Sequence, residues 1–258
     1  MCDLWRNTTD ERVPAGAIPD QIRFALDQLP PARQIKLYNS GSFFDPNAIP
    51  PEDIPAIARL VRKFESVIVE CHPRLVNDRC LAFADQLDGQ LEVAMGLETV
   101  HERALDQLNK GMTLRDFELA AGKLRAMEIA VRVFILVQPP FVPMGENLFW
   151  TQRSVDFANG TGAGAIALIP TRLGNGALDE LARQGQFSEP ELGLLESALE
   201  YGIDSQKARV FADLWDLRRF SRCQACFEAR QARLHRMNLD QQVLPPIVCP
   251  QCRASTSL

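Results

Sequence analysis

The sequences LEVAMGLE at residues 91–98 and AVRVFILV at residues 130–137, with the helical sequence between them, decide the fold. Both runs are too apolar for strands that face water. Thr99 and Glu102 predict a capping box at the start of a first helix, and Thr113 precedes a second. A strand, helices and another strand make a βαβ crossover, which requires a parallel sheet.

The same alternation continues on both sides of this unit. Further strands are predicted near residues 35, 67 and 165, each separated from the next by helical sequence. A repeated βα unit predicts a barrel or part of one, with a doubly wound open sheet as the alternative. In both folds ligands bind at the carboxyl ends of the strands. The polar residues and glycine that follow these ends are Asn39, Ser40, Gly41, Ser42, Glu70, Glu98 and Arg172.

Arg132 differs from these residues because it lies inside an apolar strand. A buried arginine needs a partner, so Arg132 is expected to face either a carboxylate or an anionic ligand. After residue 187 the pattern becomes helical and includes residues 210–217. Two domains are therefore predicted, an α/β barrel over residues 1–187 and a helical extension over residues 188–258.

Composition limits the classes of function. The 258 residues carry a net charge of −5, which argues against a globally basic nucleic-acid binder but permits a local basic patch. The sequence contains no apolar run long enough to cross a membrane and does not begin with a signal peptide. Seven cysteines in such a sequence indicate a reducing, cytoplasmic location and metal or redox chemistry in place of disulfides.

Two CxxC pairs near the end of the chain are the most specific local motif. They are separated by 22 residues, and their members are Cys223, Cys226, Cys249 and Cys252. Four thiolates in two paired knuckles predict a tetrahedral zinc site. The same region is rich in arginine, which is consistent with either a solvated helix face or a phosphate-binding patch. The arginines of the predicted patch are Arg218, Arg219, Arg222, Arg230 and Arg233.

Several short motifs together resemble one family. They are CDLWR at 2–6, KLYNSGSF at 36–43, VE at 69–70, GLET at 96–99, LNKG at 108–111 and IPTR at 169–172. They resemble the radical S-adenosylmethionine (radical SAM) enzymes, in the branch related to the Elongator catalytic subunit. The greatest similarity is to the radical subunits of archaeosine biosynthesis in transfer RNA. The resemblance runs from Cys2 to about Phe187.

The resemblance implies a partial (β/α)6 barrel that binds S-adenosylmethionine and a [4Fe–4S] cluster. An electron from such a cluster cleaves S-adenosylmethionine to a 5′-deoxyadenosyl radical, which abstracts hydrogen from a substrate. The family's cluster motif is CxxxCxxC, and Cys2 matches its third cysteine. Met1 matches the hydrophobic residue that packs near the adenine. The other two cysteines and the first barrel strand would precede Met1, so the sequence is expected to be an N-terminally truncated form.

The resemblance also implies roles for residues at the other strand ends. The loop from Asn39 to Ser42 would bind the methionyl amino group. Glu70, Glu98 and Arg132 would contact the ribose and the carboxylate. The arginine-rich tail would help to grip transfer RNA, while the motifs do not indicate an electron donor or any membrane partner.

Three functions are consistent with the sequence. The first is a radical SAM enzyme that modifies a transfer-RNA base. The second is a non-catalytic barrel that binds nucleotide or RNA, because two of the three cluster cysteines are absent from the sequence. The third is a radical SAM enzyme with a small-molecule substrate, which would show no salt-dependent binding of RNA.

Overall fold

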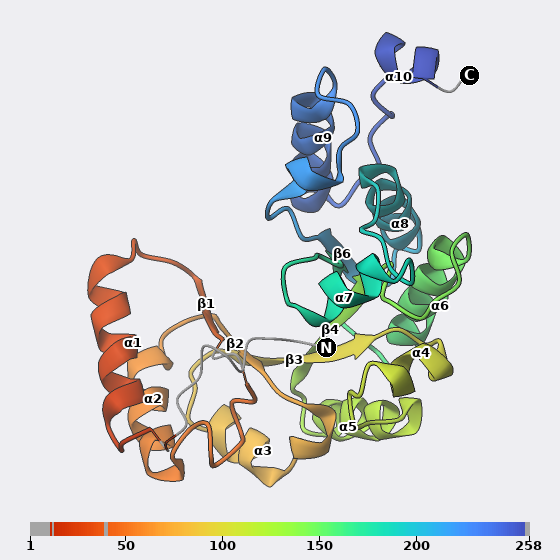
Figure 1. Cartoon of the computed structure of the whole chain (residues 1–258). Coiled ribbons are helices and arrows are strands. Elements are labelled where there is room, and N and C mark those ends of the chain that lie inside the picture. Colours follow the sequence, from red (N-terminus) through yellow and green to blue (C-terminus); the bar gives the residue numbers. More distant parts are fainter. Residues whose placement is uncertain (1–10, 12, 39–40, 256–258) are drawn as a thin grey trace.

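A computed structural model of the chain describes residues 11, 13–38 and 41–255. Its strands form one parallel sheet in the order of the sequence, and the sheet curves into a half-barrel (Figure 1). The strands are β1 (Gln34–Leu37), β2 (Ser66–Glu70), β3 (Gln90–Glu98), β4 (Ala130–Val137), β5 (Ala165–Pro170) and β6 (Arg209–Ala212). This arrangement confirms the predicted partial α/β barrel.

Most of the helices lie between consecutive strands in the sequence and pack on the convex side of the half-barrel, while the last two lie beyond its final strand (Figure 1). Short 3-10 turns lie at Pro51–Asp53, Pro73–Leu75 and Leu217–Phe220. The α-helices are α1 (Ala17–Gln28), α2 (Ile54–Val61), α3 (Asp78–Ala84), α4 (Glu102–Gln107), α5 (Leu114–Ala126), α6 (Asn147–Gly160), α7 (Ala177–Arg183), α8 (Leu192–Asp204), α9 (Phe227–Asp240) and α10 (Pro250–Ser255). Among the described residues, no helix is both long enough and apolar enough to span a membrane.

Local sequence explains where helix α5 begins and which face it buries. Thr113 and Asp116 form a reciprocal capping box at its first turn. Phe117, Ala121 and Leu124 recur at helical spacing and are fully buried against the sheet. The predicted capping box at Thr99 is wrong, because α4 is capped by His101, whose ring nitrogen accepts a hydrogen bond from the N–H of Ala104.

The predicted helix over residues 210–217 is also wrong at its start. Residues Arg209–Ala212 form strand β6, which pairs with β5 at one edge of the sheet. The sheet therefore continues beyond residue 187, where the sequence predicted a domain boundary. Val210 and Ala212 are buried on one face, as expected for a strand that alternates its side chains.

Helix α9 covers the outer edge of β6 with side-chain amides. Asn238 accepts from the N–H of Ala212 and donates to its carbonyl, at 2.8 and 2.9 Å. Gln241 makes the same pair of bonds with Val210, at 2.7 and 2.9 Å. An edge strand with free backbone groups would otherwise be open to pairing with another chain. Helix α9 and its C-cap residue Gln241 thus cover this edge of the sheet in place of a further strand.

The interior of the half-barrel holds a buried ion pair. Arg132 on β4 donates from Nε to Glu92 on β3, and the two side chains are 11% and 9% exposed. The Arg132 guanidinium also lies 5.6 Å from the ring centre of Phe211 on β6. Of the two partners predicted for Arg132, the structure shows the carboxylate. An unpaired charge at this depth would be strongly unfavourable.

We predict that Arg132→Met lowers the free energy of unfolding by about 3–5 kcal/mol, because it leaves Glu92 buried without a partner. Replacing both residues, as Arg132→Met with Glu92→Leu, is expected to recover most of that loss. Urea unfolding measures both effects. Arg62→Met is the control, because its pair with Asp88 is half-exposed and is worth about 0–1 kcal/mol. A double variant as unstable as the sum of its single variants would contradict this prediction.

Candidate functional site

A cavity of about 680 Å³ lies at the carboxyl ends of the strands. Its volume is in the range of small-molecule sites. The wall combines apolar side chains from β4 and β5 with polar groups from the ends of β2 and β3. Its lining residues include Gly41, Ser42, Glu70, Cys71, His72, Gly96, Glu98, Lys110, Phe134, Leu136, Ile169 and Arg172.

Glu98 reaches the cavity through an unusual backbone conformation. The register of β3 against β4 shifts between Gly96 and Glu98, and Glu98 has a φ of +64°. Left-handed backbone at a residue other than glycine costs about 1–3 kcal/mol and is concentrated at functional sites. The carboxylate accepts from Lys110 Nζ at 2.6 Å, and the two side chains are 15% and 28% exposed.

Gly96 makes room for this ion pair. A Cβ atom at Gly96 would lie 2.2 Å from Glu98 Oε1 and 2.6 Å from Lys110 Nζ. A glycine is therefore required for the pair to occupy its present position. The backbone around Lys110 is equally specific, since Asn109 and Gly111 on either side both have positive φ. This turn directs the Lys110 ammonium toward the end of β3.

His72 fixes the loop that carries Lys110. Its Nδ1 accepts from the N–H of Arg74 at 3.2 Å, and its Nε2 lies 3.0 Å from the Lys110 carbonyl oxygen. This pattern fits the tautomer in which Nε2 carries the proton and donates to the carbonyl. The backbone N–H of His72 donates to Ser42 Oγ at 2.9 Å. Through its ring and its backbone N–H, His72 therefore joins the loops that follow β1, β2 and α4.

Burial shifts the pKa values of two residues at the end of β2, Glu70 and Cys71. Burial raises the pKa of Glu70, while the nearby Lys110 ammonium acts in the opposite direction. Burial also raises the pKa of the Cys71 thiol to about 12, with smaller contributions from Cys80 and Asp45. Cys71 is thus a thiol at neutral pH, and it donates to the carbonyl of His72. Glu70 is the cavity acid whose proton affinity the protein increases.

Arg172 forms a rigid part of the opposite wall. Its guanidinium pairs with Asp213 at 2.8 Å and donates to the Trp215 carbonyl at 2.6 Å. The rings of Trp215 and Phe220 lie 5.0 and 5.5 Å from its central carbon. The side chain is only 13% exposed. Contacts from the loop after β6 therefore hold this arginine against the cavity.

The structure brings together most of the described residues that the sequence singled out at strand ends. Gly41, Ser42, Glu70, Glu98 and Arg172 all line the cavity. Arg132 does not, because it pairs with Glu92 nearer the amino end of β4. The structure therefore gives no support to its expected contact with a cofactor carboxylate, which stays a prediction. The other predicted residues, Met1, Cys2, Asn39 and Ser40, lie outside the described residues.

Sequence reasoning missed Lys110 and His72 as parts of this site. Lys110 belongs to the LNKG motif, but its pairing with Glu98 depends on a turn that no periodic pattern encodes. His72 lies two residues after the strand-terminal carboxylate of Glu70, at a position where loop residues face a shared site. That position was the available signal for His72.

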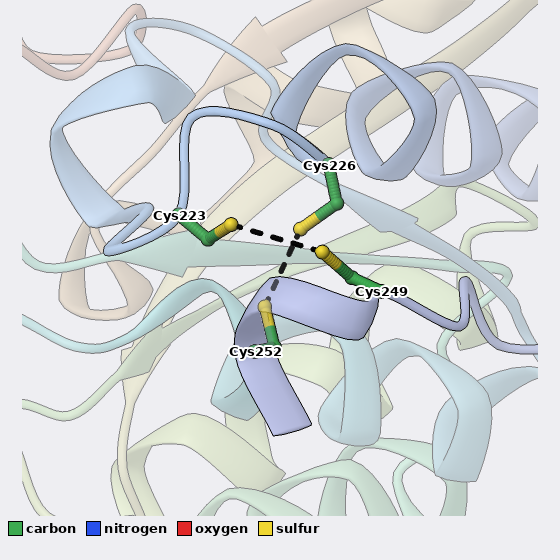
Figure 2. Close-up of side chains that lie close together, drawn as sticks. All are labelled: Cys223, Cys226, Cys249 and Cys252. Atoms are coloured by element: carbon green, nitrogen blue, oxygen red, sulfur yellow. Dashed lines mark hydrogen bonds between the residues drawn. The ribbon is translucent and has the colours of Figure 1, made fainter. Parts of the chain in front are cut away.

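The four C-terminal cysteines form a second site (Figure 2). All four sulfurs lie within 4.8 Å of one another. The Cys223–Cys249 and Cys226–Cys252 sulfur separations are 3.9 and 3.6 Å. A tetrahedral ion with bonds of about 2.3 Å to sulfur requires separations of about 3.8 Å. A disulfide would need about 2.05 Å. The thiols therefore have the spacing of ligands around a single metal ion.

The neighbouring thiols shift the pKa values of Cys223 and Cys252 in opposite directions. The backbone N–H of Cys226, followed by the Cys252 thiol, lowers the pKa of Cys223 to about 7. The sulfurs of Cys223 and Cys226 raise the pKa of Cys252 to about 12. A thiol that donates a hydrogen bond to a neighbouring sulfur keeps its proton more readily, which raises its pKa. Metal ligation requires the thiolate, so metal binding to thiols releases protons.

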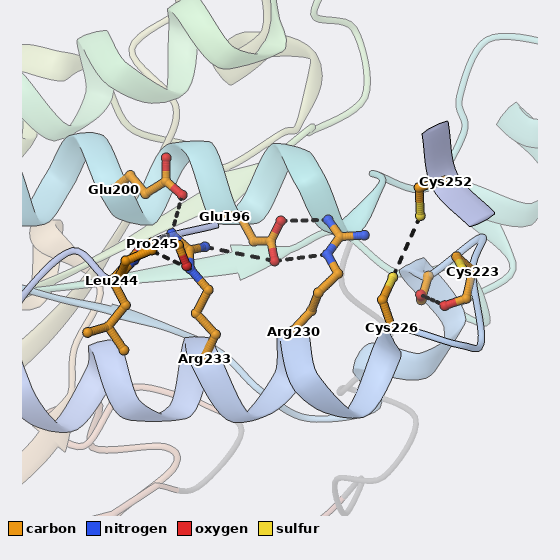
Figure 3. A network of polar contacts seen from close by, with 10 residues as sticks. Glu196, Glu200, Cys223, Cys226, Arg230, Arg233, Leu244, Pro245 and Cys252 are labelled. Atoms are coloured by element: carbon orange, nitrogen blue, oxygen red, sulfur yellow. Dashed lines mark hydrogen bonds and ion pairs between the residues drawn. The ribbon is translucent and has the colours of Figure 1, made fainter. Parts of the chain in front are cut away.

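The arginine-rich region consists mainly of arginines that already have carboxylate partners. Four pairs join the region to α8 or to the loop before it: Arg219–Glu189, Arg222–Glu191, Arg230–Glu196 and Arg233–Glu200. Arg233 is 5% exposed and lies between α8 and α9 (Figure 3). A buried, paired arginine is not available to a phosphate. Arg233 therefore does not belong to the basic patch that the sequence predicted.

Curated proteins from archaea are similar to this chain. A protein of Methanocaldococcus jannaschii without an assigned function is 23% identical over 83% of the chain and 62% of its own length. Archaeosine synthase subunit beta of Methanosarcina acetivorans is 30% identical over 63% of the chain and 49% of its own length. The chain thus spans between about half and three fifths of the length of these relatives. No family model matches the sequence.

A solved structure shares the fold. The Elp3 protein of Methanocaldococcus infernus, in a form with an N-terminal deletion, superposes with a TM-score of 0.60. The superposition covers 76% of this chain and 52% of that protein at 15% identity. The chain is thus similar in sequence to two proteins named archaeosine synthase subunit beta and in fold to Elp3. The resemblance carried by the sequence motifs is thereby confirmed, and the strand-end cavity is the site to consider for a cofactor.

Proposed function

We propose that the strand-end cavity binds S-adenosylmethionine and that the protein takes part in radical SAM modification of a transfer-RNA base. The observation that carries this proposal is the convergence of Ser42, Glu70, Glu98 and Lys110 on one cavity. The relatives named archaeosine synthase subunit beta support a nucleoside of RNA as the substrate. They do so by sequence similarity over about half of their length.

The chemistry of the wall suits the parts of S-adenosylmethionine. Carboxylates such as Glu70 and Glu98 accept from ribose hydroxyls and attract an ammonium or sulfonium group. Lys110 supplies a positive charge for the methionyl carboxylate. Phe134, Leu136 and Ile169 provide apolar surface for the adenine ring. Each charged or apolar part of the ligand therefore has a counterpart in the wall.

The described part of the wall does not by itself fit a [4Fe–4S] cluster. Its cysteine is Cys71, whose buried thiol is protonated at neutral pH, whereas a cluster requires thiolates. Cys2, the ligand implied by the resemblance, lies outside the described residues. The proposal for this cavity therefore concerns the binding of S-adenosylmethionine.

We further propose that the four C-terminal cysteines bind zinc. Four sulfur ligands with tetrahedral spacing are typical of structural zinc sites. The closed ligand set leaves no open coordination position, so the ion would stabilise structure and would not bind substrate. Arg230 lies beside the site and donates two hydrogen bonds to Glu196, at 3.0 and 2.5 Å (Figure 3).

RNA contact is proposed for Arg218 and Arg222. Their side chains are 57% and 82% exposed, and each pairs with a surface carboxylate. Surface ion pairs are worth about 0–1 kcal/mol, so a phosphate can replace the carboxylate at little cost. Arg222 immediately precedes Cys223, and Arg218 lies five residues before it. A metal-stabilised knuckle would hold them in place.

We predict that Gly96→Ala weakens the binding of S-adenosylmethionine about tenfold, which corresponds to about 1.4 kcal/mol. The new methyl group displaces the ends of Glu98 and Lys110, which are flexible side chains, so the fold is retained. Calorimetric titration measures the affinity, and thermal unfolding checks the fold. Gly164→Ala is the control, because its nearest neighbour would be 3.9 Å away. Equal affinity in Gly96→Ala and wild type would refute this role of the ion pair.

We predict about one zinc ion per chain by elemental analysis, and much less in Cys249→Ser, because three thiolates no longer close the site. Cys80→Ser is the control, since Cys80 is a buried residue of α3 and is not part of the four-cysteine cluster. The same zinc content in Cys249→Ser and wild type would remove Cys249 from the ligand set.

We predict that Arg218→Glu with Arg222→Glu weakens transfer-RNA binding and reduces its log–log salt slope by about 1–2, because fewer counterions are released. Filter binding over a series of salt concentrations measures the slope. Arg23→Glu with Arg33→Glu is a matched control, because these side chains have the same exposed fractions and similar surface pairs. Equal salt slopes in the two double variants would show that net charge, and not contact through Arg218 and Arg222, causes the change.

A further inference from the structure

The second pair of cysteines is delivered by a segment with little structure of its own. Residues 241–249 return from the end of α9 to the four-cysteine site without forming a helix or strand. Pro245 and Pro246 have no backbone N–H, so this part of the segment offers carbonyl oxygens but few donors. Val248, next to Cys249, is 65% exposed. Packing alone therefore holds this segment weakly.

Arg233 binds the carbonyls of this segment. Its Nε donates to the carbonyls of Leu244 and Pro245 at 3.1 and 2.9 Å, and one terminal nitrogen donates to Leu244 at 2.5 Å. The same terminal nitrogen pairs with Glu200 on α8 at 2.6 Å (Figure 3). In the described part of the chain, residues 242–248 receive their hydrogen bonds from Arg233 alone.

Arg233 also lies on the helix that carries the first pair of cysteines. Cys226 caps the start of α9, and Arg233 is seven residues further along the same helix. A single buried side chain thus connects the element that presents Cys223 and Cys226 with the segment that presents Cys249 and Cys252. Fixing a long loop before the metal binds removes part of the entropic cost of closing it.

We propose that Arg233 is a positioning residue of the metal centre, which anchors the return segment so that Cys249 and Cys252 face Cys223 and Cys226 before the ion binds. This inference rests on the proposed metal site and is independent of the proposed cofactor cavity. Arg233 touches no ligand atom of the metal. It sets the metal affinity through the segment that it holds.

The test uses the full chain and Co²⁺ as the probe, with affinity measured by chelator competition. Tetrahedral thiolate ligation gives Co²⁺ a distinct absorption spectrum, which reports the geometry of the site. Arg233→Met is expected to lower the affinity by about 10–100-fold, the usual range for residues that orient metal ligands. Arg233→Lys keeps a buried cation but has fewer oriented donors. Its metal affinity is therefore expected to lie between those of wild type and Arg233→Met.

Two controls separate the anchoring of the segment from other effects. Glu200→Gln removes the closer of the two α8 carboxylates that pair with Arg233, while Glu196 remains at 4.0 Å. The contacts with Leu244 and Pro245 are also left, so the metal affinity is expected to change less than threefold. Arg236→Met removes an exposed arginine of the same helix. Arg236 pairs with Asp240, and its replacement is expected to leave the metal affinity unchanged. Circular dichroism of the metal-free variants shows whether α9 is retained.

The outcomes are distinct. Weaker binding in Arg233→Met and Arg233→Lys, with both controls near wild type, supports the role of Arg233. Equal affinity and an equal Co²⁺ spectrum in Arg233→Met and wild type would overturn it while leaving the metal site intact. A loss in Glu200→Gln as large as that in Arg233→Met would also overturn it, because the helix pair would then be responsible. No Co²⁺ binding by the wild-type protein would overturn the metal site and this role together.

Discussion

Parallel pairing of the strands in the order of the sequence is the constraint on which the rest of this structure depends. Each strand lies beside the one that precedes it, so every connection must return along the convex side of the sheet. All six carboxyl ends then meet at one rim. Glu70, Glu98 and Arg172 are far apart in the sequence, yet they share one cavity because each follows a strand. The cavity is thus a consequence of topology, and its chemistry depends on the residues just after the strands.

The two ion pairs of the half-barrel show how position determines the role of a charge. Arg132 and Glu92 lie at the amino ends of their strands, where both are nearly buried and each satisfies the other. Such a pair favours one register of β3 against β4 and adds little net stability. Glu98 and Lys110 lie at the opposite ends, partly exposed in a cavity, and require a left-handed residue and a glycine. Backbone strain of this kind is concentrated at functional sites.

The sequence was sufficient to predict those elements whose signal is local and periodic. The β-branched runs of β2, β4 and β5 and the apolar face of α5 predicted these elements, and the cysteine spacing predicted a four-thiol cluster. It was insufficient where a contact joined distant positions. Strand β6 has only four residues between helical sequences, too few to show a period of two. The partner of Arg132 lies forty residues away on the neighbouring strand. Glu92 is also a charged residue inside an apolar run, but only the order and register of the strands bring the two together.

The C-terminal extension is part of the barrel in physical terms. Asn238 on α9 occupies the backbone groups of Ala212, and the next residue, Asp213, holds Arg172 in the cavity wall. At its other end the same helix begins at Cys226, and its middle anchors the segment that carries the second cysteine pair. A continuous set of contacts therefore joins the four-cysteine site, α9, the edge of β6 and the rim of the cavity. A bound metal ion would hold α9 at its start, and a helix held at its start keeps Asn238 and Gln241 in register with β6. The extension thus performs for the last strand the task that a neighbouring strand performs for each of the others.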